Sequence, residues 1–101
     1  MVQKNMAEKT MMRWLEVIKL RAAGKGEGLL DELFGEMNHA GHDGGLLEIK
    51  TYRHFALDSD WSVHLHWESE RVEQNGSTLG LSLARALKEF GLVDHSLWIE
   101  E

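Results

Sequence analysis

The residues from Trp61 to Glu68 alternate between apolar and polar side chains without interruption. Side chains on a β-strand point to opposite faces in turn, so this pattern predicts a strand with one apolar face and one polar face. The apolar face carries Trp61, Val63, Leu65 and Trp67, and the polar face carries Ser62, His64, His66 and Glu68. The chain therefore needs a sheet that buries one face and leaves histidines on the other.

The rest of the chain supplies further strands and two helices. The alternation predicts strands over residues 12–20, 46–55, 61–70 and 95–100, and the apolar periodicity predicts helices over residues 27–40 and 78–90. The first helix has an apolar stripe at the spacing i, i+3, i+4 and i+7, formed by Leu30, Leu33, Phe34 and Met37. Ser77 is a suitable N-cap for the second helix, and Gly91 is expected to end it in the left-handed conformation.

The order β-α-β-β-α-β predicts a ferredoxin-like α+β fold, in which two helices cover one face of a four-stranded antiparallel sheet. We expect one such domain over residues 12–101 and a flexible tail over residues 1–11. The short connection at residues 56–60 predicts a hairpin that places Tyr52 opposite His64 and Lys50 opposite His66. The helices are expected to cover an aliphatic face formed by Leu15, Val17, Leu47, Ile49, Val63, Leu65, Leu97 and Ile99.

The opposite face, called the open face below, lies on the side of the sheet away from the helices. The sequence places on it Trp14, Glu16, Ile18, Leu20, Tyr52, His54, His64, His66 and Trp98. A contiguous apolar surface of this kind marks an interface or a ligand site. The simplest cover is a second copy of the chain packed about a two-fold axis, so we expect a homodimer.

The open-face histidines and aromatic residues are the candidate functional residues. His64, His66 and His54 are candidates for catalytic acid–base chemistry, because imidazole titrates near neutral pH. The same histidines could instead bind a metal ion or line a wet interface. Trp14, Tyr52 and Trp98 could form the wall of a site for a planar hydrophobic ligand, or pack in the dimer interface. No cofactor and no metal site are assigned.

Two further motifs favour ordinary structural roles. His39 and His42 flank the end of the first helix, where a histidine interacts favourably with the negative end of the helix dipole. Asn75-Gly76-Ser77 precedes the second helix and could bind an anion through backbone N–H groups, but a simple helix cap explains it as well.

Composition excludes several classes of partner. The net charge of −6 argues against nucleic-acid binding, which usually requires a basic surface. No apolar run approaches the ~20 residues of a membrane-spanning helix, and no apolar leader segment is visible near Met1. The absence of cysteine excludes disulfides and is what we expect of a cytoplasmic protein.

The order of elements, the aromatic open face, Trp67-Glu68-Ser69 and Trp98-Ile99-Glu100 together resemble a known group of proteins. Over residues 12–100 the chain resembles the dimeric α/β-barrel superfamily and, within it, the antibiotic-biosynthesis-monooxygenase-like proteins. The resemblance implies a face-to-face dimer and a cofactor-free monooxygenase, or a binding protein, for a planar hydrophobic molecule. The residues themselves leave two alternatives open, namely a non-catalytic structural or regulatory homodimer and a histidine-based metal-binding protein.

Overall fold

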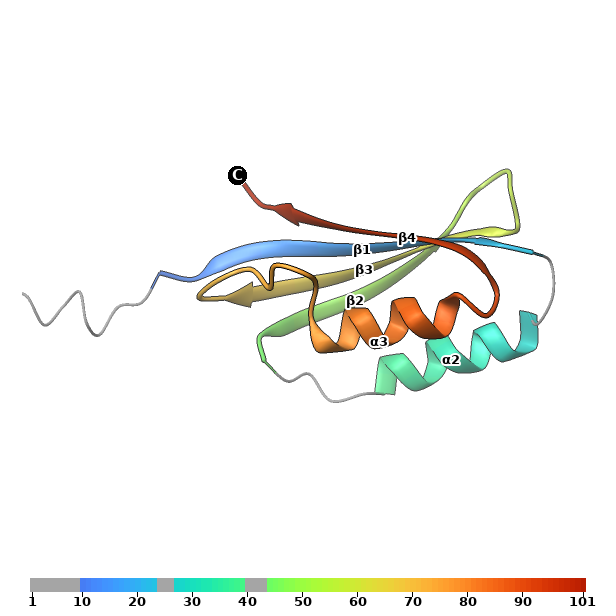
Figure 1. The fold of residues 1–101 in the computed structure, drawn as a ribbon, viewed down its shortest axis with the longest axis horizontal. Helices are drawn as coiled ribbons and strands as arrows, with labels where there is room; N and C mark the ends of the chain where they lie inside the picture. The colour runs from blue at the N-terminus through green and yellow to red at the C-terminus, as the bar shows by residue number, and fades with distance from the viewer. Residues whose placement is uncertain (1–9, 24–26, 40–43) are drawn as a thin grey trace, which may run out of the picture.

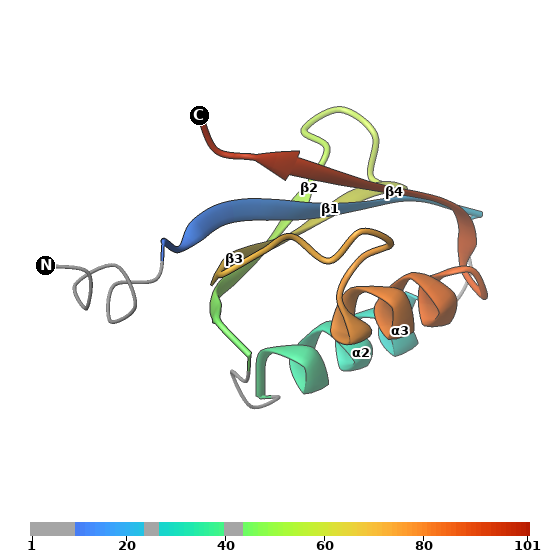
Figure 2. The same ribbon diagram turned by 60° about the vertical axis from the view of Figure 1, so that its left-hand side comes forward.

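The computed structural model describes residues 10–23, 27–39 and 44–101. Its elements are β1 (Met12–Ala22), α2 (Glu27–His39), β2 (Leu46–Arg53), β3 (Asp60–Ser69), α3 (Thr78–Leu87) and β4 (Gly91–Ile99). The strands form one sheet in the order β2-β3-β1-β4, and every neighbouring pair is antiparallel. Both helices lie on one side of this sheet (Figures 1 and 2). The predicted ferredoxin-like α+β fold is thus confirmed.

The core lies between the helices and the inward face of the central strands. Ile18, Val63, Leu65 and Leu87 are completely buried there, and burial of each such side chain contributes about 1.5–3 kcal/mol. From α2, the buried side chains of Leu30, Phe34 and Met37 join this core. The predicted apolar stripe of the first helix therefore faces the sheet.

The predicted orientation of β1 is wrong. Trp14, Glu16, Ile18 and Leu20 point toward the helices and are buried, whereas Leu15 and Val17 point to the open face. The register shows this directly, because Trp14 pairs with the inward Trp67 and Leu15 pairs with the outward His66. The physical reason is Glu16, whose carboxylate finds enough hydrogen-bond donors inside the protein to be buried.

The β2–β3 hairpin differs from its predicted register by two residues. Tyr52 pairs with Ser62, and Lys50 pairs with His64. The connection closes tightly, because the backbone N–H of His54 donates to the carbonyl of Asp60 at 2.8 Å. It rises from the sheet on the side opposite the helices (Figures 1 and 2). A register irregularity between Leu46 and Glu48 also leaves Leu47 exposed, so its predicted place in the helix-covered face is wrong.

The end of α3 and the start of β4 also depart from the prediction. Ser77 caps α3 as predicted, since its Oγ accepts from the backbone N–H of Gly80 at 2.8 Å. The helix ends at Leu87, however, and Gly91 is the first residue of β4. The φ angle of Gly91 is not positive. A side chain at Gly91 would overlap the backbone of Arg21 on the neighbouring strand. Close packing of β4 against β1, rather than a left-handed helix cap, therefore explains this glycine.

Replacing the inward Trp14 and the outward Leu15 separately tests the orientation of β1. Trp14→Ala should lower the free energy of unfolding by about 3–5 kcal/mol, because it leaves a cavity in the core. Leu15→Ala should cost less than about 2 kcal/mol, because Leu15 is only partly covered. Denaturant unfolding of dilute protein measures both values, and a larger cost for Leu15 than for Trp14 would restore the orientation predicted from sequence.

Candidate open-face site

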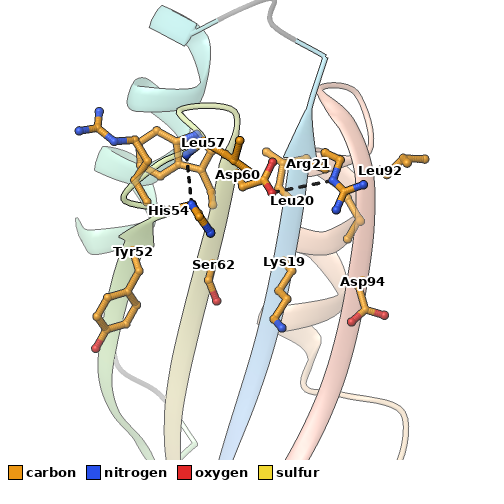
Figure 3. A pocket seen from close by; sticks show the side chains of 13 residues that line it. Lys19, Leu20, Arg21, Tyr52, His54, Leu57, Asp60, Ser62, Leu92 and Asp94 are labelled. Carbon is orange, nitrogen blue, oxygen red and sulfur yellow. Dashed lines mark hydrogen bonds and ion pairs between the residues drawn. The ribbon is translucent and has the colours of Figure 1, made fainter.

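The open face is built from four strands whose outward residues lie in rows across the sheet. One row contains Tyr52, Ser62, Lys19 and Asp94, one from each strand (Figure 3). The next row contains Lys50, His64, Val17 and Ser96, and the third contains Glu48, His66, Leu15 and Trp98. His64 and His66 thus lie on the open face as predicted, at the middle of the sheet.

His64 is the most strongly surrounded of these histidines. Its Nε2 lies 2.9 Å from the Oγ of Ser62, and its ring centroid lies 4.8 Å from that of Tyr52. The pKa of His64 is lowered from its usual 6.5, mainly by burial and further by the neighbouring His66, Lys19 and Lys50. Near neutral pH this imidazole is uncharged, so it can accept a proton from a bound molecule.

His66 and Trp98 lie in the same row, with Leu15 between them. The Nε2 of His66 is buried without a hydrogen-bond partner among the described residues. The ring centroids of His66 and His64 are 6.4 Å apart. The indole N–H of Trp98 donates to the Oγ of Ser96 at 2.9 Å, and the ring remains more than half exposed. His66 therefore has an unused polar atom beside an exposed aromatic surface.

The structure does not bring His54 to the pair formed by His64 and His66. Its Nδ1 accepts hydrogen bonds from the backbone N–H groups of Ala56 and Leu57, at 3.0 and 3.1 Å. Its ring also stacks on Phe55, with the centroids 5.3 Å apart. The contacts of His54 thus stabilise the turn of the β2–β3 hairpin. The sequence around His54 gave no indication of this structural role.

Two concavities open on this face. The larger, of about 600 Å³, lies at the hairpin end, and its floor includes Tyr52, Ser62 and Lys19 (Figure 3). His54, Leu57 and the ion pair between Arg21 and Asp60 also line it, with 3.8 Å between Arg21 Nε and Asp60 Oδ2. A smaller concavity of about 380 Å³ lies at the other end and is lined in part by His66, Leu47 and Trp98. Tyr52 and Trp98 thus line different ends of one surface.

Trp14 was predicted to be on this surface, but its ring is inside the protein. It is 3% exposed and stacks on Trp67, with ring centroids 5.4 Å apart. Both rings border a third cavity, of about 620 Å³, between the sheet and the start of α3. The ring of Trp14 is therefore buried on the helix side of the sheet, although the residue also borders the smaller concavity.

Sequence reasoning missed a polar cluster on the helix side of the sheet. Glu16 is fully buried, and its carboxylate accepts hydrogen bonds from Trp67, from both the backbone N–H and the hydroxyl of Ser77, and from His95. The available signal was a single carboxylate within the apolar stretch Trp14–Leu20, which indicates a buried partner. Nothing in the sequence identified His95 as that partner.

The described residues contain no group of three or more histidine, aspartate or glutamate side chains arranged to hold a metal ion. The predicted histidine pair at residues 39 and 42 is not fully covered, because residues 40–43 lie outside the described residues and the surroundings of the His39 side chain are not described. Within the part of the chain that the structure describes, no helix is long and apolar enough to cross a membrane.

Comparisons with known proteins give no match to this chain. No family model, no curated protein and no solved structure is significantly similar to it. The geometry of the described residues is therefore the main basis for a functional proposal.

The lowered pKa of His64 gives a testable dependence on pH. A histidine whose folded-state pKa is below its unfolded value binds fewer protons when folded, so stability falls as the pH drops from above ~6.5 toward the folded pKa. NMR titration of the His64 ring should give a midpoint below 6.5.

Replacing Lys19 or Lys50 with methionine should raise that midpoint, because each removes a nearby positive charge. Lys88→Met is the matched control, since Lys88 is an exposed lysine just beyond α3. A midpoint that does not respond to Lys19 or Lys50, or that responds equally to Lys88, would contradict the described surroundings of His64.

Proposed function

We propose that the chain forms a homodimer through its open face and binds a planar hydrophobic small molecule there. The observation that supports this most directly is the concavity of about 600 Å³ that Tyr52 helps to line, within the size range of small-molecule sites. His64 lies next to it through its ring contact with Tyr52. The exposed apolar residues along the whole face support a covered surface: Leu47, Tyr52, Leu57, Leu92 and Trp98.

Charge on the open face favours one orientation of the second copy. The outward charged residues of β1 are all basic, namely Arg13, Lys19 and Arg21, whereas β3 has the outward acids Asp60 and Glu68. A two-fold axis parallel to the strands places β1 of each copy over β3 of the other. A two-fold axis across the strands instead places β1 over β1, so that basic side chains meet basic side chains. Like-charge contacts of this kind cost several kcal/mol, which favours the parallel axis.

The same axis also brings apolar residues together. It places β2 of one copy over β4 of the other at the same level along the strands. Leu47 then faces Trp98 of the second copy, and the hairpin residues Phe55 and Leu57 face Leu92, all of them exposed in the single chain. The same axis brings each of two ion pairs against its own symmetry copy, namely Arg21 with Asp60 and Arg13 with Glu68. Each ion pair and its copy then form a cluster of four alternating charges. Charge and apolar surface thus agree on one arrangement.

Within such a dimer, His64 is the candidate acid–base residue. Burial and two neighbouring lysines favour its neutral form, so it can take a proton from a hydroxyl group of an aromatic ligand. His66 lines the smaller concavity next to Trp98, at the other end of the same face. This arrangement is compatible with the cofactor-free monooxygenase chemistry of the antibiotic-biosynthesis-monooxygenase-like proteins, which we propose as the reaction class to test first.

The proposed dimer is tested by exchanging the charges of one ion pair. Arg21→Glu should raise the dimer dissociation constant by about tenfold or more, because the cluster formed by residues 21 and 60 of both copies then contains only acids. The double variant Arg21→Glu/Asp60→Arg restores alternating charge and should recover most of the affinity. Sedimentation equilibrium at several protein concentrations measures the constant.

Glu89→Lys is the control, because this exposed glutamate lies two residues after the end of α3, a helix that is on the side of the sheet opposite the open face. Monomeric wild-type protein at high concentration would refute the dimer. Equal weakening by the single and double Arg21 variants would refute the parallel axis.

Ligand binding is tested by thermal shift with a panel of quinols and polycyclic phenols. A ligand that binds only the folded state adds ~2.7 kcal/mol of stability at a hundredfold excess over its dissociation constant. The His64→Gln/His66→Gln double variant and Tyr52→Ala should both lose the shift while remaining dimeric. Leu81→Ala replaces an exposed leucine on α3 and should keep it. No shift with any compound in the wild-type protein would favour the non-catalytic homodimer.

A further inference from the structure

His95 lies on the opposite side of the sheet from the open face and is held by a buried carboxylate. Its Nε2 is 2.6 Å from the Oε2 of Glu16. Glu16 is 0% exposed, and the described residues place no lysine or arginine in ion-pair contact with it. Among the described residues, His95 is therefore the basic side chain that contacts this carboxylate.

The other contacts of Glu16 are all hydrogen-bond donors. Trp67 Nε1 donates to Oε1 at 3.1 Å, and the backbone N–H of Ser77 donates to Oε2 at 3.0 Å. The Ser77 hydroxyl accepts from Gly80, so its own hydrogen is directed to Glu16 Oε1, at 2.6 Å. These three groups donate to the carboxylate, and the His95 tautomer with its hydrogen on Nε2 supplies a fourth hydrogen bond to it. The lone pair of the neutral imidazole is then on Nδ1.

Nδ1 of His95 is the reactive end of the ring. It has no hydrogen-bond partner among the described residues, and it is not one of the buried unpaired atoms. The side chain is 18% exposed, so the ring reaches solvent through its edge. Gly76 packs directly against the side of the ring that faces Glu16, because a Cβ at that position would lie 2.5 Å from His95 Cε1 and 3.0 Å from its Nε2.

We propose that His95 is a nucleophilic site for small activated acyl compounds and that Glu16 is its positioning residue. This proposal does not depend on the open-face dimer. Nδ1 attacks the carbonyl carbon, the new N–C bond forms, and the leaving group departs as an anion with the electrons of its C–O bond. The ring then carries a positive charge, which the Glu16 carboxylate stabilises across the short hydrogen bond. Water adds to the acyl carbon, the N–C bond breaks, and a carboxylic acid, a proton and neutral His95 are released.

A purely structural role for His95 makes the opposite prediction about its reactivity. A histidine that only links β4 to Glu16 on β1 reacts according to its accessibility, so it is slower than an exposed histidine. His54 provides that comparison within the same molecule, because its side chain is on an exposed turn and its Nδ1 is occupied by backbone N–H groups. The relative rates of the two residues therefore distinguish the two roles.

The experiment treats wild-type protein at neutral pH with diethyl pyrocarbonate, an activated acyl compound that leaves a stable ethoxycarbonyl group on histidine. Peptide mass spectrometry over time gives a separate rate for each residue. We expect His95 to react about tenfold faster than His54, which corresponds to ~1.4 kcal/mol of transition-state stabilisation. A rate for His95 equal to or below that of His54 would overturn the proposal, and this comparison requires no variant to fold.

Substitutions at three positions test the role of Glu16 and the identity of the nucleophile. Glu16→Gln, checked for native circular dichroism, should slow His95 by about tenfold and leave His54 unchanged, whereas an unchanged His95 would overturn the role of Glu16. Release of p-nitrophenol from p-nitrophenyl acetate should fall in His95→Asn and persist in His54→Asn. Equal release by these two variants would overturn His95 as the nucleophile.

Discussion

The buried carboxylate of Glu16 connects elements from the whole chain. It lies on β1 and receives hydrogen bonds from β3, from the N-terminal cap of α3 and from β4. A buried charge is tolerated only when its hydrogen-bonding positions are filled, and here four donor groups fill them. Gly80 is needed for the same reason, because a side chain there would overlap the carboxylate. The position of α3 over the sheet thus depends on one polar cluster as well as on apolar packing.

That cluster also determines which residues reach the open face. Because Glu16 turns inward, Trp14, Ile18 and Leu20 turn inward with it, and the basic residues of β1 turn outward. The outward face is consequently rich in paired charges and histidines rather than in tryptophan. A polar and aromatic surface of this kind suits a wet interface that also holds a ligand.

The sequence predicted the order of elements because each element has a clear period. The strand over residues 61–70 alternates strictly, and the two helices have continuous apolar stripes. Residues 12–20 gave no such guidance, since both faces of β1 are largely apolar and either could have faced the helices. The inward direction was decided by partners of Glu16 that lie up to 79 residues away, and local periodicity contains no information about them. The same limit applies to His95, which looks like any other residue of an edge strand.

The hairpin register shows a second limit. The turn residues Ala56–Asp60 allow several pairings, and the side chain of His54 selects one of them by accepting two backbone N–H groups. A histidine in this role has no established turn signature, unlike asparagine or glycine. His64 and His66 were correctly placed on the open face, because a shift of two residues leaves every side chain on the same face.

The two edges of the sheet differ in how well they resist unwanted pairing. The β2 edge has a register irregularity and the charged residues Glu48, Lys50 and Arg53, which discourage the addition of another strand. The β4 edge pairs with β1 without interruption over nine residues, and Asp94 is its only acidic or basic residue apart from His95. Its outer backbone groups are a template on which a partly unfolded molecule can add a strand. Aggregation of this protein on heating would therefore begin at β4. A single lysine substituted at a β4 residue that points to the open face would suppress it.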